Sequence, residues 1–205
     1  MRQNRQERVI YLLRHGKPVM ENTERRYIGQ LDIPLSEEGV RQASLLQTEF
    51  AARDIAAVFC SDLVRSVATA EIIAGKLGLR PLIRQDLREI GMGEWEGKTF
   101  REIAHRFPDE YVKRGNDIAG YRIPGAESFT EGQTRIIAAF TEIAGTTAGN
   151  LLIVGHAGIN RLLFCHLLGM PLENLFKISQ DYGCINMLTD HKGQFCVTLL
   201  NKLIF

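Results

Sequence analysis

Long apolar segments are missing from this sequence of 205 residues. No run approaches the roughly 18 consecutive apolar residues that a membrane-spanning helix needs. The first eight residues are polar and rich in arginine, and they lack the apolar stretch of a secretory signal. We therefore expect a cytoplasmic protein with no membrane partner, in which residues 1–8 form a flexible tail.

Cysteine and net charge are also scarce. The cysteines form no close pair and no spacing typical of a metal site, so we expect reduced residues of the core at all four positions, Cys60, Cys165, Cys184 and Cys196. The 25 lysines and arginines nearly balance the 24 aspartates and glutamates, for a formal net charge of +1. This balance gives no global field that would attract nucleic acid, so any anion must be bound by a local cluster of charges.

Apolar residues, by contrast, make up 45% of the sequence, which is enough to bury the core of a single domain over residues 1–205. Short apolar runs predict strands over residues 9–13, 55–60, 81–83 and 151–154, and a final hairpin of residues 184–188 and 195–199. Apolar residues at helical spacing predict helices over residues 36–52, 63–77, 99–107, 130–144 and 159–168. Repeated strand–loop–helix units indicate an α/β protein with three α/β/α layers around a mostly parallel central sheet.

The pattern loosens between residues 86 and 128. Several glycines surround Trp95, residues 113–125 look like a loop, and arginines and lysines are spread through the segment. Long segments of this kind often carry function. We interpret residues 86–128 as a short helical excursion, or lid, over a site on the main domain.

Charged, hydroxyl or imidazole side chains follow three of the predicted strands, at the point where each strand ends. Arg14-His15-Gly16 follows the first strand, Ser61-Asp62 with Arg65 follows the second, and Gly155-His156-Ala157-Gly158 follows the strand at 151–154. A lone Arg-His-Gly can simply be a strand that meets solvent. Because the carboxyl ends of parallel strands share one edge of a sheet, however, two histidines and two arginines can converge there. Guanidinium groups and a neutral imidazole suit a phosphate monoester, which is an anion near neutral pH.

Four motifs in order make the sequence resemble the histidine phosphatase superfamily, the family of the phosphoglycerate mutase-like enzymes. They are Leu13-Arg14-His15-Gly16, Ser61-Asp62-Leu63 with Arg65 and Thr69-Ala70, Leu87-Arg88-Glu89 leading to Trp95-Glu96-Gly97, and Val154-Gly155-His156-Ala157-Gly158. The resemblance extends from residue 9 to the final hairpin. It implies the phosphoglycerate mutase-like fold and a metal-independent phosphomonoester hydrolase without a cofactor, since arginines supply the positive charge.

The resemblance also implies roles for single residues. His15 is the expected nucleophile that becomes phosphohistidine, Arg14, Arg65 and His156 are expected to hold the phosphoryl group, and Glu89 is the expected general acid. Three further phosphate or substrate contacts are expected, from Asn22, Gly29 and Ala157. Asn22 stands one position later than the asparagine of many family members. Either the loop carries an insertion and Asn22 serves, or this contact is absent.

Hydrolysis and phosphoryl transfer share this chemistry, so the motifs leave the function partly open. The segment between Glu89 and His156 is short compared with the mutases, which favours a phosphatase acting on a small phosphorylated metabolite, such as α-ribazole phosphate or a sugar phosphate. The alternatives are phosphoglycerate mutase-type transfer and a non-catalytic phosphate-binding or docking module. We expect a small-molecule substrate as the partner, and a monomer or homodimer.

Overall fold

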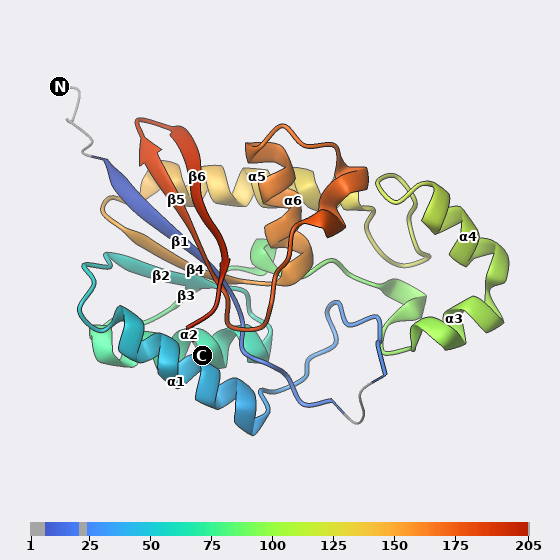
Figure 1. Cartoon of the computed structure of the whole chain (residues 1–205), viewed down its shortest axis with the longest axis horizontal. Coiled ribbons are helices and arrows are strands. Elements are labelled where there is room, and N and C mark those ends of the chain that lie inside the picture. The colour runs from blue at the N-terminus through green and yellow to red at the C-terminus, as the bar shows by residue number, and fades with distance from the viewer. Residues whose placement is uncertain (1–6, 21–23, 205) are drawn as a thin grey trace.

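A six-stranded sheet forms the centre of the computed structural model, which describes residues 7–20 and 24–204 (Figure 1). The strands are β1 (Arg8–Arg14), β2 (Ala57–Cys60), β3 (Leu82–Ile83), β4 (Leu151–Gly155), β5 (Ile185–His191) and β6 (Gln194–Lys202). Their spatial order is β3-β2-β4-β1-β5-β6. The first four are parallel, whereas β5 and β6 form an antiparallel hairpin beside β1.

Helices cover both faces of this sheet, as predicted. In Figure 1, α1 (Glu37–Phe50) and α2 (Val64–Leu77) lie below the sheet, and α5 (Phe129–Thr146) and α6 (Ala157–Leu167) lie above it. Successive residues of β1 alternate between the two cores because side chains of a strand point to opposite faces. Ile10 and Leu12 belong to the core between the sheet and α5 and α6, whereas Tyr11 and Leu13 belong to the core between the sheet and α1 and α2.

Local signals in the sequence explain where these helices begin and end. The Ser36 hydroxyl accepts a hydrogen bond from the backbone N–H of Gly39 and caps α1. Gly78 ends α2 in the left-handed region, with φ of 67°, which glycine adopts without strain. Ser128 and Glu131 form a capping box at the start of α5.

The excursion forms a small helical unit at one end of the molecule (Figure 1). It contains α3 (Phe100–Arg106) and α4 (Pro108–Asn116), and it has a core of its own, formed by Tyr27, Trp95, Ile103 and Ile123. The expectation of a loop from residue 113 is wrong, because α4 continues to Asn116. Proline at its first position and acidic residues in its first turn favour this helix. No residue of α4 is buried, however, so its sequence has no apolar stripe from which a helix could be predicted.

Three-residue 3₁₀ turns span Gln85–Leu87 and Gly93–Trp95, and a longer one spans Leu172–Lys177. In the part of the chain that is described, no helix is long and apolar enough to cross a membrane.

Two further expectations need correction. Arg8, placed in the flexible tail, is the first residue of β1 and is buried against Asp190, 2.8 Å away. Residues 1–6 of that tail lie outside the described residues. Cys196 is exposed rather than buried, because every second residue of the edge strand β6 faces solvent. Cys60, Cys165 and Cys184 are buried free thiols, as expected.

Candidate active site

The register of the parallel strands brings the predicted site residues to one edge of the sheet. Arg14 of β1 lies opposite Gly155 of β4, and Cys60 of β2 lies opposite Val154. The next residue along each strand, His15, His156 or Ser61, therefore lies at or beside the same edge. The His15 and His156 rings have centroids 5.0 Å apart.

His15 is buried and is held in one tautomer. Its Nδ1 lies 2.7 Å from the carbonyl oxygen of Gly16, so Nδ1 carries the proton and donates it. The lone pair of Nε2 faces the Nε–H of Arg65 at 3.2 Å. Burial, with the charges of Arg14 and Arg65, lowers the pKa of His15 well below its usual value, while the bond to Gly16 raises it. A neutral imidazole whose Nε2 carries no proton is a nucleophile once the hydrogen bond from Arg65 to that lone pair is released.

Arg65, on α2, is fixed by the loop that precedes α1. Its two terminal nitrogens donate to the carbonyl oxygens of Leu31 and Gly29 at 2.8 and 2.6 Å. Glu96 holds the other side of this loop, because its carboxylate accepts from the backbone N–H groups of Gly29 and Leu31. The predicted residue Gly29 therefore positions Arg65 through its carbonyl group. A Cβ atom on Gly29 would lie 2.2 Å from the Ile90 carbonyl oxygen, so only glycine fits there.

Arg14 reaches the site from the end of β1. One terminal nitrogen donates to the carbonyl oxygen of Gln180 at 2.6 Å, and the guanidinium lies 3.6 Å from the centroid of the Tyr182 ring. Its Nε is buried without a hydrogen-bond partner among residues 7–20 and 24–204. The Gln180 side chain is itself held by the buried amides of Asn160 and Asn186. An amide cluster behind β1 thus fixes Arg14.

His156 precedes the first residue of α6 and is fully buried. Its Nε2 lies 2.6 Å from the Ser61 hydroxyl oxygen, and its Nδ1 has no hydrogen-bond partner in the described part of the chain. Burial, followed by the charges of His15 and the arginines nearby, lowers the pKa of His156 well below its usual value. His156 is therefore neutral near neutral pH.

Glu89 is bound at the N-terminus of α6. Its Oε2 accepts from the backbone N–H of Gly158, and its Oε1 accepts from those of Ile159 and Ile90, at 2.9 to 3.1 Å. A Cβ atom on Gly158 would lie 2.4 Å from Oε1, so glycine at this position permits the approach. Oε2 accepts a single bond and retains a lone pair that can carry a proton.

The remaining predicted residues are less directly placed. Ala157 is the first residue of α6, beside His156, and is nearly buried. Asn22 lies outside the described residues. No group of three or more His, Cys, Asp or Glu side chains in the described residues is arranged to hold a metal ion.

Sequence reasoning missed several contributors to this site. Glu96 stands in the Trp95-Glu96-Gly97 motif, which was noticed without a role for the carboxylate. Ser61 stands in the Ser61-Asp62-Leu63 motif after the second strand, and the motif gives the serine no role of its own. Gln180 and Tyr182 stand in an irregular stretch that offers no pattern from which their contacts with Arg14 could be inferred.

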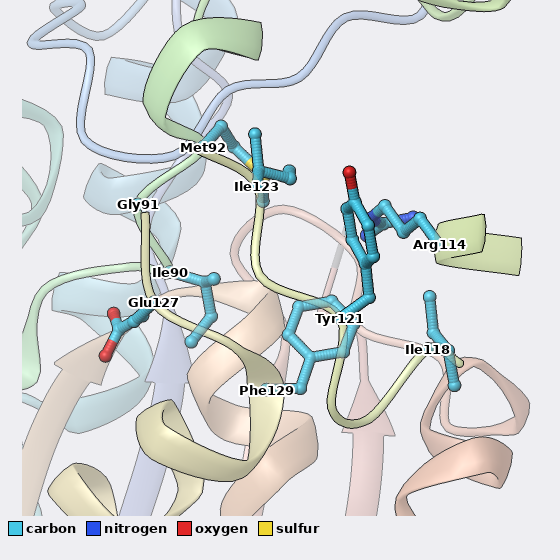
Figure 2. Close-up of a pocket in the computed structure, with 9 residues that line it drawn as sticks. All are labelled: Ile90, Gly91, Met92, Arg114, Ile118, Tyr121, Ile123, Glu127 and Phe129. Carbon is cyan, nitrogen blue, oxygen red and sulfur yellow. The ribbon is translucent and has the colours of Figure 1, made fainter. Parts of the chain in front are cut away.

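Two hollows adjoin the segment that carries Glu89. A small cavity of about 10 Å³ lies beside Ile90. Figure 2 shows side chains that line it, among them Arg114 and Tyr121 of the excursion and Phe129 of α5. The Arg114 guanidinium lies 5.4 Å from the Phe129 ring centroid, and burial lowers the pKa of Arg114. A wider hollow of about 410 Å³, open to solvent, is lined by residues of the same segment and of the loop at 125–127.

Comparison with known proteins shows which proteins this chain is similar to. The family model of the histidine phosphatase superfamily (branch 1) matches residues 10–203. The adenosylcobalamin/alpha-ribazole phosphatase of Escherichia coli is 31% identical over 94% of this chain and 95% of its own. "Probable phosphoglycerate mutase GpmB" of Yersinia pestis is 36% identical over 79% of this chain and 75% of its own. A mycobacterial glucosyl-3-phosphoglycerate phosphatase superposes with a TM-score of 0.84 at 25% identity, covering 96% of this chain and 99% of that one.

The chain therefore belongs to the histidine phosphatase superfamily, and its α/β three-layer fold is that of the family. It is an enzyme that hydrolyses phosphomonoesters of small metabolites.

Proposed function

We propose that this phosphatase works through a phosphohistidine on His15. The observation that carries the proposal is the meeting, at one sheet edge, of a neutral His15 with the guanidinium of Arg65, the ring of His156 and the carboxyl group of Glu89. Arg14 adds a second guanidinium. These cations and donors suit the charge on the oxygens of a phosphoryl group in transfer.

The proposed first step transfers the phosphoryl group to the enzyme. The Nε2 lone pair of His15 attacks phosphorus, the bond from phosphorus to the ester oxygen breaks, and Glu89 gives its proton to the departing oxygen. In the second step, Glu89 takes a proton from water, the water oxygen attacks phosphorus, and the phosphorus–nitrogen bond breaks. Inorganic phosphate leaves, and His15 and Glu89 regain their starting protonation states.

The substrate proposed here is a phosphorylated small metabolite, α-ribazole phosphate or a sugar phosphate. The names of the E. coli and mycobacterial relatives support this class. The excursion would act on the choice of leaving group through the Glu89 segment, because Arg114 and Tyr121 pack beside that segment around a cavity of about 10 Å³, which is too small for a leaving group (Figure 2). A panel of α-ribazole phosphate, sugar phosphates, phosphoglycerates and phosphoamino acids, compared by kcat/KM, would rank these candidates.

Replacement of the nucleophile tests the mechanism. His15→Ala is expected to abolish hydrolysis of p-nitrophenyl phosphate and the trapping of acid-labile phosphate on the protein. The matched control is His105→Ala, which removes an exposed imidazole from α3 and should change neither result. Full activity in His15→Ala would overturn the phosphohistidine proposal.

A mutase-type transfer is the second candidate, and the Yersinia pestis relative supports it by name. Both functions would pass through the same phosphohistidine. The two are separated by comparing the rate at which inorganic phosphate is released with the rate at which the phosphoryl group is transferred to phosphoglycerate. We expect phosphate release to be faster, and faster transfer would favour the mutase.

We further propose that the chain forms one domain with residues 86–128 as its lid. We also propose a cytoplasmic location, a monomer or homodimer, and no nucleic-acid or membrane partner.

A further inference from the structure

Ser61 and His156 form a buried pair whose hydrogen bonds can be counted. The Ser61 hydroxyl oxygen has two partners within the described residues, the His156 Nε2 at 2.6 Å and the backbone N–H of Leu63 at 3.4 Å. Ser61 and His156 are both fully buried. The Leu63 N–H can only donate, so His156 Nε2 is the only one of these two atoms that can accept the hydroxyl proton.

Two proton arrangements are possible for a neutral His156. If Nε2 carried the proton and donated it to Ser61, the Ser61 hydroxyl proton would be buried without an acceptor. If Ser61 donates to Nε2, the hydroxyl and Nε2 are both satisfied, and the ring proton sits on Nδ1. The first arrangement leaves two buried groups unpaired in the described chain, the Ser61 hydroxyl proton and the Nδ1 lone pair, whereas the second leaves only the Nδ1 proton. Because unpaired buried polar groups are rare, the count favours the second arrangement.

The charges around His156 support a neutral ring. Besides burial, the groups that disfavour its protonation are His15 and Arg14 at the end of β1, Arg65 of α2 and Arg135 of α5. Glu89 of the adjoining segment is bound to backbone N–H groups. No bond between Glu89 and the ring is observed in the described part of the chain.

We infer that Ser61 is a positioning residue, which fixes His156 in the tautomer with a proton on Nδ1 and so turns Nδ1 into a hydrogen-bond donor for a phosphoryl oxygen. Two observations support the inference: Nδ1 is the ring's only nitrogen without a partner in the described chain, and the ring lies 5.0 Å from that of His15. The phosphoryl part of this inference rests on the proposed function. The tautomer does not.

The direct test is a ¹⁵N spectrum of the histidine side chains of the unmodified enzyme, which distinguishes the two tautomers. The His156 signals are assigned by their loss in His156→Gln. We expect His156 to be neutral with the proton on Nδ1, and we expect this proton signal to shift when inorganic phosphate is added. A proton on Nε2, or a signal that phosphate at saturation leaves unmoved, would overturn the inference.

Kinetics of Ser61→Ala provide the second test. With the hydroxyl gone, nothing fixes the tautomer, and we expect kcat to fall about tenfold to a hundredfold with a smaller change in KM, as for a misplaced catalytic group. Ser61→Thr restores the hydroxyl and is expected to recover most of the rate. Unchanged kcat in Ser61→Ala would contradict the positioning role.

Ser66→Ala is the matched control, because Ser66 is also fully buried and donates to the Val154 carbonyl oxygen at 2.8 Å without touching His156. It should leave kcat and the His156 spectrum unchanged. Failure of the phosphohistidine proposal would show differently: acid-labile phosphate would not be trapped by the unmodified enzyme, while the tautomer could still be read from its spectrum.

Discussion

Under the proposed mechanism Glu89 has two tasks, because its one carboxyl group would both give and take a proton. Its two oxygens are held by three backbone N–H groups, and Gly158 leaves room for it against α6. These contacts fix the carboxyl group without neutralising it with a side-chain cation. In the proposed acid role, the group that exchanges a proton with Glu89 is therefore supplied by the substrate.

Replacement of Glu89 by glutamine removes the transferable proton. We expect Glu89→Gln to slow alkyl phosphates, whose leaving oxygens need protonation, at least tenfold more than p-nitrophenyl phosphate, whose leaving group departs as an anion. The measurement is the ratio of kcat/KM for the two substrate classes in variant and parent enzyme. Both values of kcat/KM in the ratio are measured on the same protein, so a smaller fraction of folded enzyme lowers both equally and leaves the ratio unchanged. Equal losses on both classes would contradict the acid role.

Site residues whose side-chain type and position after a predicted strand are both distinctive could be predicted from the sequence. His15 and His156 are predictable because each directly follows an apolar strand, and Arg65 because it lies near the start of the helix that follows such a strand. The contacts of Gln180 and Tyr182 with Arg14 could not be found in this way, since they depend on how an irregular stretch folds back over the end of β1. Ser61 was visible, but its role depends on a 2.6 Å contact with a residue far away in the chain.

At the scale of elements, the loop before α1 is held between two oppositely charged side chains. Arg65 of α2 binds its carbonyl oxygens, and Glu96 of the excursion binds its N–H groups, both at Gly29 and Leu31. Glu96 also accepts from the N–H of Met92, within its own segment. One carboxylate therefore links the excursion to the guanidinium that faces His15.

In the structure Oε1 of Glu96 accepts from both Gly29 and Leu31, whereas Oε2 accepts from Met92. Glutamine at position 96 has a single acceptor oxygen, so it can keep the bonds to the loop or the bond to Met92 but not both, and its amide nitrogen would face an N–H group. We expect Glu96→Gln to weaken the link between the loop and the excursion, to misalign Arg65, and to lower kcat for p-nitrophenyl phosphate about tenfold to a hundredfold, since small displacements of catalytic groups are costly. Glu96→Asp keeps the charge but shortens the side chain, and we expect it to recover only part of the rate.

Glu94→Gln is the control for this prediction, because it removes an exposed carboxylate two residues away. It should leave kcat unchanged. Loss of stability without loss of kcat in Glu96→Gln would assign Glu96 to folding alone.

At the scale of the whole molecule, the layers were predictable and the excursion was only partly so. The central strands and the four covering helices follow from their apolar residues, because these residues are buried in the two cores on either side of the sheet. The α4 helix buries no residue, so its sequence lacks that signal. The parallel register, in turn, is what makes distant motifs neighbours: Arg14 meets Gly155 across 141 residues only because β1 and β4 pair in this register.

Burying two neutral histidines at this sheet edge makes the stability of the whole protein depend on pH. Burial is the first cause that lowers the pKa of both His15 and His156 in the folded protein. In the unfolded chain both regain a pKa of about 6.5. As the pH falls below about 6.5, the unfolded chain therefore binds protons that the folded protein does not, and the free energy of unfolding decreases by up to about 1.4 kcal/mol per pH unit for each histidine.

Removal of one of these histidines should change this slope and not merely the stability. Urea unfolding measured at intervals between pH 7.5 and about 5.5 is expected to give a steeper loss for the parent protein than for His15→Ala, by up to about 1.4 kcal/mol per pH unit at the acid end. His105→Gln is the matched control, because it removes an exposed imidazole of α3 that lies outside the buried pair, and it should retain the parent slope. Parallel curves for the parent and His15→Ala would show that His15 is protonated as readily in the folded protein as in the unfolded chain. That result would also remove the neutral nucleophile on which the phosphohistidine step depends.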